Sequence, residues 1–158
     1  MSAAQSNPII IRGLEPGSNK VLSTFRCESG PDRIDFRKGA DFDQDPAQGP
    51  EAAFGRFKST LPGSLHLAFM MDRSSLPDPV GTQFDDDITR DVLLLRKTTV
   101  DVDPKRRQPP VVRVTWGQYA WIGRVRDLQV DYKIFRPDGR PLRARVRLSM
   151  MAEEVAAT

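Results

Sequence analysis

The stretch 124–150, RVRDLQVDYKIFRPDGRPLRARVRLSM, decides the fold. Two runs in which apolar and polar residues alternate flank Pro137-Asp138-Gly139, and this period of two is typical of strands with one buried face. Proline fixes φ early in the turn and Asp-Gly supplies positive φ, so the runs are predicted to pair as an antiparallel hairpin. The inward residues expected on the return strand are Leu142, Ala144, Val146, Leu148 and Met150.

The outward face of that return strand carries three arginines, Arg143, Arg145 and Arg147. Such a face can be a solvated surface that prevents aggregation, a contact between subunits, the lining of a pore or a nucleic-acid surface. Sheets that bind nucleic acid interleave aromatic residues with the cations, and this face has none. The pattern therefore favours the first three interpretations.

Shorter segments predict further strands. Val112, Val114 and Trp116 share a face before Gly117 interrupts the run, and Tyr119–Ile122 leads to Gly123. Towards the N-terminus, strands are expected over Pro8–Arg12, Lys20–Cys27, Arg33–Lys38 and Leu65–Met71, separated by glycine- and proline-containing turns. The expected fold class is mainly β with one helix.

The single helix is predicted over roughly Asp86–Thr99. Ile88, Val92 and Leu95 recur at i, i+4 and i+7, and Leu94 widens the apolar stripe. The aspartates at 85–87 supply an N-cap and favourable negative charge at the positive end of the helix dipole. A metal site is the alternative for this triplet, but capping accounts for it without a ligand.

Residues 39–63 break the strand pattern and are expected to form a long loop. Asp41, Asp43 and Asp45 alternate there as at the start of a calcium loop, but the glycine and the final glutamate of an EF-hand are missing. A solvated loop is the preferred interpretation. A loop of this length is usually functional, or is ordered by a partner.

A second connector, Asp103–Pro110, holds a cluster of cations at Lys105, Arg106 and Arg107. Such a cluster can bind phosphate groups. Prolines on both sides make a solvated loop the preferred interpretation.

Size and composition indicate one globular unit. The chain has 158 residues, of which 39% are hydrophobic and 28% charged, as in ordinary globular domains. We expect residues 1–158 to form a single β domain with flexible ends at 1–7 and 152–158. No window approaches the roughly 18 apolar residues that span a bilayer, and no secretory signal is present. The expected location is the cytoplasm, until the protein joins a larger assembly.

Charge is unevenly distributed along the chain. The net charge is +3, yet residues 1–100 hold 12 basic and 14 acidic side chains, whereas residues 101–158 hold 12 and 7. This asymmetry fits a nucleic-acid surface, and it fits equally the end of a subunit that docks on an acidic neighbour.

The sequence offers no candidate catalytic group. Cys27 and His66 are the single cysteine and the single histidine, so Cys27 can form no intramolecular disulfide and has no second thiol with which to bind a metal. Both residues are expected in or against strands. No nucleophile–base pair and no phosphate-binding glycine loop are visible. We predict a protein without catalytic residues, metal or cofactor.

At this point the sequence resembles a known family, the tube-adaptor proteins of contractile injection systems, which are related to tube and baseplate proteins of contractile-tailed phages. The matching residues are the strand ending in Trp116-Gly117, the segment Gly123-Arg124-Val125 and the turn from Phe135 to Ala144. Upstream, Leu65–Asp72 is similar to the family's strand that ends in aspartate, and Ile88–Leu95 to its following helix. The resemblance covers roughly residues 64–152.

The resemblance implies a tail-tube fold, an antiparallel β-sandwich or barrel with one flanking helix. It also implies a hexameric ring that serves as adaptor or initiator between the spike or baseplate hub and the inner tube of a phage tail-like particle, released or anchored to a membrane. The implied partners are other copies of the chain, the spike or hub protein, the inner tube protein and other baseplate proteins. The side chains expected at interfaces or in the channel are Arg143, Arg145, Arg147, Arg124, Arg126, Trp116, Lys105, Arg106 and Arg107.

Two features depart from the family pattern. Family members usually have Asn-Pro after the phenylalanine of the early strand, whereas Arg26 and Cys27 follow Phe25 here. Many also continue into a peptidoglycan-binding LysM domain, which is not expected in this chain. The alternative from another class is a nucleic-acid-binding β-barrel that uses the arginines at 143, 145 and 147 and the cations at 105–107.

Overall fold

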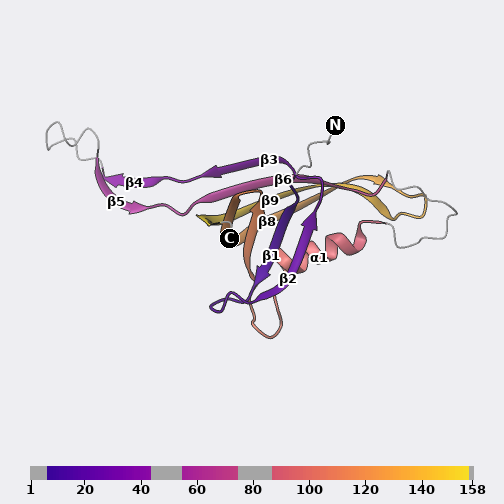
Figure 1. The fold of residues 1–158 in the computed structure, drawn as a ribbon, viewed down its shortest axis with the longest axis horizontal. Helices are drawn as coiled ribbons and strands as arrows, with labels where there is room; N and C mark the ends of the chain where they lie inside the picture. The colour runs from indigo at the N-terminus through magenta and orange to yellow at the C-terminus, as the bar shows by residue number, and fades with distance from the viewer. Residues whose placement is uncertain (1–6, 44–54, 75–86, 157–158) are drawn as a thin grey trace.

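Long strands of alternating pattern dominate the computed structural model, which describes residues 7–43, 55–74 and 87–156 (Figure 1). The N-terminal half contains five short strands and one of intermediate length, followed by a helix and three more strands. The elements are β1 (Ile9–Leu14), β2 (Val21–Cys27), β3 (Pro31–Arg37), β4 (Ala40–Asp43), β5 (Arg56–Thr60), β6 (Ser64–Asp72), α1 (Thr89–Thr99), β7 (Val111–Trp116), β8 (Tyr119–Phe135) and β9 (Pro141–Val155).

Seven of the strands form one antiparallel sheet in the order β2-β1-β7-β8-β9-β6-β3. The expected class, mainly β with one helix, is confirmed. The barrel form of that expectation is wrong, because β2 and β3 are not paired with each other and the sheet stays open. Each edge strand therefore presents backbone N–H and C=O groups that no strand of the described sheet pairs.

The β8–β9 hairpin, which the sequence predicts, lies in the middle of this sheet. Its strands pair from Ala120↔Val155 to Phe135↔Pro141, and Gly139 takes the positive φ of 92° that the turn requires. Ala144, Val146, Leu148 and Met150 are all buried. The single β8 replaces the two runs expected on either side of Gly123, and β9 continues to Val155, so the predicted flexible end at 152–158 is wrong for residues 152–155.

The sheet is folded so that its two halves pack against each other. The rings of Phe25 on β2 and Phe69 on β6 lie 5.8 Å apart, although β2 is at one end of the strand order and β6 is next to the other end. Phe36 on β3 similarly lies 6.3 Å from Trp121 on β8. The core is thus enclosed as in a sandwich, by one continuous sheet rather than two.

Two features of β8 allow the sheet to bend at this place. Arg126 has no partner on β9 and is the extra residue of a β-bulge, which bends and twists a strand. Gly123 lies so close to β9 that an added Cβ would be 1.7 Å from the carbonyl oxygen of Met151. Glycine is required where two backbones approach this closely.

Helix α1 covers the β1–β2 part of the sheet, and Val92 and Leu95 bury their side chains there (Figure 1). The helix begins at Thr89, later than predicted, and Leu94 is exposed rather than part of the buried stripe. Burial raises the pKa of Asp87, but the hydrogen bonds from the Thr89 N–H and hydroxyl and the charges of Arg140 and Arg136 together outweigh it, so the pKa lies below its usual value. The N-cap residue is Ile88, so the predicted aspartate N-cap is wrong for Asp87, which lies one residue earlier and accepts a hydrogen bond from the Thr89 N–H. Asp85 and Asp86 lie outside the described residues.

The segment 39–63 is not a loop throughout, and this expectation is wrong at both its ends. Strands β4 and β5 pair there as a separate antiparallel ribbon, which we call the arm. The arm projects from the sheet beyond the ends of β3 and β6 (Figure 1). Residues 44–54, including Asp45 of the aspartate pattern, lie outside the described part, as do residues 1–6 and 157–158 of the expected flexible ends.

Candidate functional site

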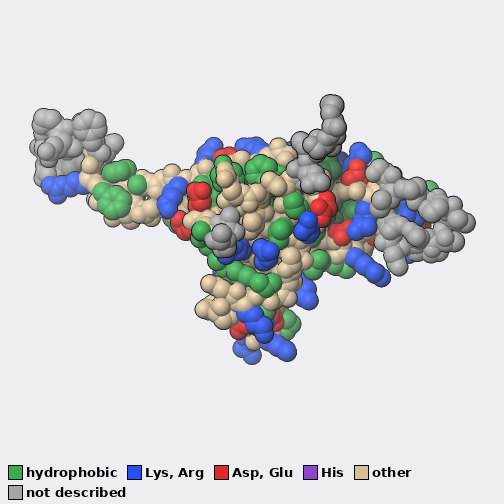
Figure 2. Space-filling view, in the orientation of Figure 1, with side chains coloured by type: hydrophobic (Ala, Val, Ile, Leu, Met, Phe, Trp, Pro, Cys, Tyr) green, Lys and Arg blue, Asp and Glu red, His purple; other side chains and the backbone are tan. Residues whose placement is uncertain are grey.

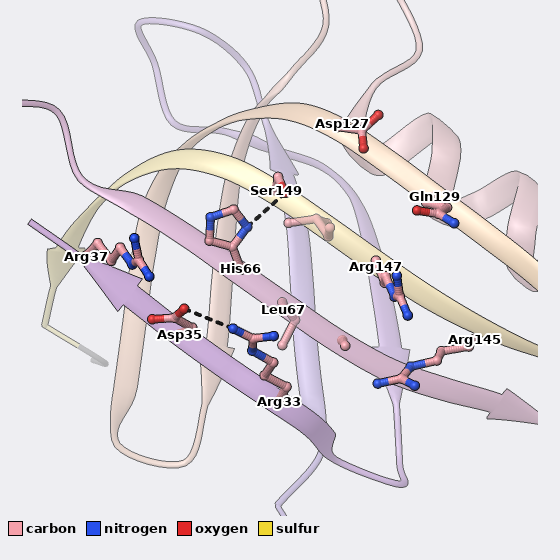
Figure 3. A pocket seen from close by; sticks show the side chains of 12 residues that line it. Arg33, Asp35, Arg37, His66, Leu67, Asp127, Gln129, Arg145, Arg147 and Ser149 are labelled. Carbon is pink, nitrogen blue, oxygen red and sulfur yellow. Dashed lines mark hydrogen bonds and ion pairs between the residues drawn. The ribbon is translucent and has the colours of Figure 1, made fainter.

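The outward face of β3, β6, β8 and β9 forms a polar hollow of about 460 Å³ (Figure 3). Its position follows from strand alternation, because residues with one parity point to the core and those with the other parity point away from it. We call it the cationic hollow. Four arginines, two aspartates and His66 supply its charged and titratable lining: Arg33, Arg37, Arg145, Arg147, Asp35, Asp127 and His66.

Strand register explains why the surface is hollow at this place. Arg33 on β3 lies opposite Ala68 on β6, which in turn lies opposite Arg147 on β9. Gln129 on β8 completes the row. A methyl group between two long cationic side chains leaves a depression with arginines on both sides.

The cationic charge of the hollow is only partly compensated. Arg33 forms an exposed ion pair with Asp35, with 3.3 Å between Nη2 and Oδ2. Arg37, Arg145 and Arg147 form no salt bridge with any residue in the described ranges. Nε of Arg145 is buried and lacks a hydrogen-bond partner there. The hollow therefore offers guanidinium donors suited to carboxylate or phosphate groups.

A second set of cross-strand neighbours in the hollow is centred on His66. This residue lies opposite Asp35 on one side and Ser149 on the other, and its Nδ1 is 3.0 Å from Ser149 Oγ. Its Nε2 is 3.3 Å from Ser64 Oγ. A catalytic triad needs a third group that orients the base, but Asp35 pairs with Arg33 instead. The described residues also contain no group of three or more potential metal ligands.

The predicted arginine face of β9 is divided between two places. Arg145 and Arg147 line the hollow, whereas Arg143 lies at the end of β6 and donates to Asp72, with 2.8 Å between Nη2 and Oδ2. Hydrogen bonds from Ser74 and the contact with Arg143 lower the pKa of Asp72 to about 2. Arg143 therefore stabilises the strand end, and its guanidinium is not free for a partner.

Two other predicted arginines hold the 101–110 segment on the body. Arg124 donates to the carbonyl oxygen of Pro109 at 2.8 Å and to Oε1 of Gln108 at 3.0 Å. Arg106 pairs with Asp103 and also with Glu15, the latter at 3.4 Å. Of the three cations at 105–107, Arg106 is thus paired within the chain, whereas Lys105 and Arg107 are exposed.

The two remaining predicted residues also lie outside the hollow. Arg126 is the bulge residue of β8 and is exposed. Trp116 packs partly against the core, stacks on Tyr119 and donates from Nε1 to the carbonyl oxygen of Asn7 at 3.1 Å. Of the nine predicted residues, the structure places Arg145 and Arg147 together in the hollow.

Sequence reasoning missed the contribution of β3 and β8 to this site. The charged face of β3 was visible as Arg33, Asp35 and Arg37 alternating with apolar residues. No pattern in the sequence indicated that β3 pairs with β6, and this pairing brings the three residues beside β9. Asp127 and Gln129 were not distinguishable from any other solvated strand face.

Cys27 and His66, the two residues considered as catalytic candidates, both lie in strands of the sheet. Cys27 is a buried free thiol on β2, 3.2 Å from Ser29 Oγ. His66 lies on β6, as expected for a residue in a strand, and lines the hollow.

The edges, the arm and the charged face of the molecule together indicate a class of protein. Two open sheet edges, a protruding arm and a broad charged face are typical of a subunit that assembles with other chains. The sequence profile described as contractile injection system tube protein matches residues 9–158. The chain therefore belongs to this family, and the resemblance found in the sequence is confirmed.

The family assigns the protein a structural role in a contractile injection system, where it assembles with other tube or baseplate components. No curated protein matches the chain. In the described part of the chain, α1 is the single helix, and neither its length nor its composition would allow it to cross a bilayer.

Proposed function

We propose that this chain is one subunit of a hexameric ring that serves as adaptor or initiator between the spike or baseplate hub and the inner tube. The observation that carries the proposal is a sheet with two unpaired edge strands, β2 and β3, in a member of a tube protein family. Contacts between unlike surfaces of neighbouring copies close a ring and protect sheet edges at the same time. The protein would assemble in the cytoplasm as one unit, with architecture rather than catalysis as its role.

The purified chain tests this proposal directly. Native mass spectrometry of the chain alone, and of the chain mixed with the spike and inner tube proteins encoded with it, is expected to give a six-copy species. Cryo-electron microscopy of whole particles should place that ring between spike and tube. The proposal is contradicted if the chain stays monomeric both alone and in the mixture and is missing from particles.

The cationic hollow has a place in this ring. We propose that it faces the central channel or a neighbouring subunit, because Arg145 and Arg147 remain without salt bridges to the described residues and so are available to a partner or to passing molecules. Arg147→Cys in the assembled ring tests the position. Labelling by a small maleimide but not by a bulky polymer-linked maleimide indicates the channel. Labelling by neither indicates a subunit contact, and labelling by both contradicts the proposal.

The cationic hollow also motivates the second candidate, binding of nucleic acid. Four arginines supply phosphate-binding groups, yet no aromatic side chain lines the hollow, and stacking is a main source of affinity for single strands. Oligonucleotide binding measured at several salt concentrations decides the matter. Binding that weakens steeply with salt and is lost in Arg145→Gln/Arg147→Gln supports this candidate; no binding at low salt removes it.

A further inference from the structure

The arm carries apolar side chains that nothing in the described chain covers. Phe42 is 50% exposed and Phe57 is 65% exposed, and their rings meet edge to face with centroids 6.1 Å apart. Leu61, where the arm joins the body, is 45% exposed. Hydrophobic side chains accordingly gather on the projecting arm in the space-filling view (Figure 2).

The arm has little means of holding its shape alone. β4 pairs with β5, and neither strand belongs to the seven-stranded sheet. A two-stranded ribbon by itself is at best marginally stable in water and needs a third strand or a packed surface. Exposed aromatic residues at the centre of such a ribbon are the usual anchors of protein interfaces.

The body contains an apolar hollow of about 320 Å³ that no part of the described chain fills. It lies between the start of β2, the end of α1 and the 101–110 segment, and Leu22, Val102, Pro104 and Pro110 supply apolar lining. Val102 is 59% exposed at this place. This volume is at the lower end of the range of pockets that bind drug-sized molecules, so a phenyl ring can enter.

The charges around the two surfaces are balanced, because Asp101 pairs with Arg96 and Asp103 with Arg106, while Lys58 lies 4.0 Å from Asp41. β5 places Arg56 and Lys58 on either side of Phe57, and Asp101 and Asp103 lie at the hollow. The hollow also has Lys97 and Arg106, so it is neutral as a whole, and Asp41 on β4 gives the arm an acidic side chain as well. Docking would therefore meet no net repulsion, and the apolar side chains rather than the charges carry the contact.

We propose that the arm of one copy docks in the apolar hollow of the next copy, with Phe57 as the anchor residue. This inference rests on the proposed ring, since a tube subunit meets further copies of itself. The arm is made of β4 and β5, whereas the hollow lies between β2, α1 and the 101–110 segment, so the contact joins unlike surfaces. Such a contact repeats from copy to copy and gives a ring or an open chain rather than a closed pair. The neighbouring copy then supplies the surface against which the two-stranded arm packs.

A cysteine pair tests the contact. In the variant Phe57→Cys/Val102→Cys, mild oxidation is expected to give a ladder of disulfide-linked oligomers on a non-reducing gel. Each single variant carries one half of the pair and is expected to give no ladder. Dimers from Phe57→Cys alone would show that arms meet arms, which overturns the inference.

A mixing experiment distinguishes docking from a loss of fold. Phe57→Ser removes the anchor and Val102→Glu blocks the hollow, and both changes are at exposed positions. Each variant is expected to lose the ring in native mass spectrometry, while an equimolar mixture regains a dimer through the one intact contact. Phe135→Ser is the matched control, because this phenylalanine is 54% exposed but lies in neither surface, and it should keep the wild-type assembly.

The outcomes separate this inference from the proposed ring. A six-copy ring without the cross-linked ladder overturns the inference and leaves the ring in place. A ladder in a protein that forms open chains rather than closed rings supports the contact and contradicts the ring. A monomeric protein without a ladder overturns both.

Discussion

The sheet body and the arm are both made of paired antiparallel strands, yet their phenylalanine side chains lie in different surroundings. In the body, Phe69 is fully buried against Phe25 and other core residues. In the arm, Phe57 has Phe42 as its ring partner and is 65% exposed. The same residue type thus stabilises the fold in one region and is available for assembly in the other, because stabilisation depends on the apolar area that folding removes from water.

Replacing each phenylalanine by alanine should separate the two regions most strongly. Phe69→Ala is expected to lower the free energy of unfolding by about 3–5 kcal/mol, through lost burial and the cavity left behind. Phe57→Ala should change it by less than about 0.5 kcal/mol, as exposed positions do. Urea unfolding followed by circular dichroism measures both. Similar losses for the two variants would mean that the arm is part of the cooperative core.

Two glycines provide the next comparison. An added Cβ at Gly123 in the body would meet backbone atoms of β9, whereas at Gly39, beside the arm, it would make an ordinary contact of 3.7 Å with Leu61. Gly123→Ala is expected to cost about 3 kcal/mol, because neither backbone can move without breaking the β8–β9 pairing. Gly39→Ala should be nearly neutral. Thermal unfolding of the two variants side by side is the measurement, and a neutral Gly123→Ala would contradict the close approach of β8 and β9.

The carboxylate of Asp72, which accepts hydrogen bonds from Ser74 and pairs with Arg143, gives a smaller, pH-dependent effect. The pKa of Asp72 is about 2 in the fold, below the value of about 3.9 of an unfolded chain. Its contribution to stability is therefore present above pH 4 and is lost as the pH falls towards 2. Because the pair is partly exposed to solvent, we expect Asp72→Asn to cost about 1 kcal/mol at pH 7.

The pH comparison uses chemical unfolding at pH 7 and near pH 2. The difference between wild type and Asp72→Asn should shrink to nearly zero at the lower pH. Asp32→Asn, at an exposed carboxylate on β3, is the control and should give the same small difference at both. A difference for Asp72→Asn that does not change with pH would show that the charge of this carboxylate is not what stabilises the strand end.

The smallest effect on stability is expected in the cationic hollow. Arg147 is exposed and forms no salt bridge with the described residues, so Arg147→Gln should change the free energy of unfolding by less than about 0.5 kcal/mol. The same urea titration measures it. A loss above about 1 kcal/mol would mean that this arginine belongs to the fold rather than to a surface for partners.

Much of the body could be predicted from the sequence because its signals are local. Alternation, the turn at Pro137–Gly139 and the glycine at 123 mark β8 and β9. The helix was predicted too early, since the aspartate run suggests an N-cap, whereas the N-cap residue is Ile88 and Asp87 accepts from the Thr89 N–H just before it. The arm was missed because aspartate, proline and glycine recur between residues 39 and 63, and these residues are typical of turns and loops.

The sequence by itself determined the strand alternation, the hairpin, the helix and, through the resemblance, the family. Only the tertiary structure decided that the sheet remains open, and that β3 lies beside β6 so that Arg33 meets Arg147 across Ala68. It also decided which cations are bound within the chain, as Arg106, Arg124 and Arg143 are. The physical reason is that period and turn chemistry act between neighbouring residues, whereas strand order and ion pairs depend on contacts between residues distant in sequence.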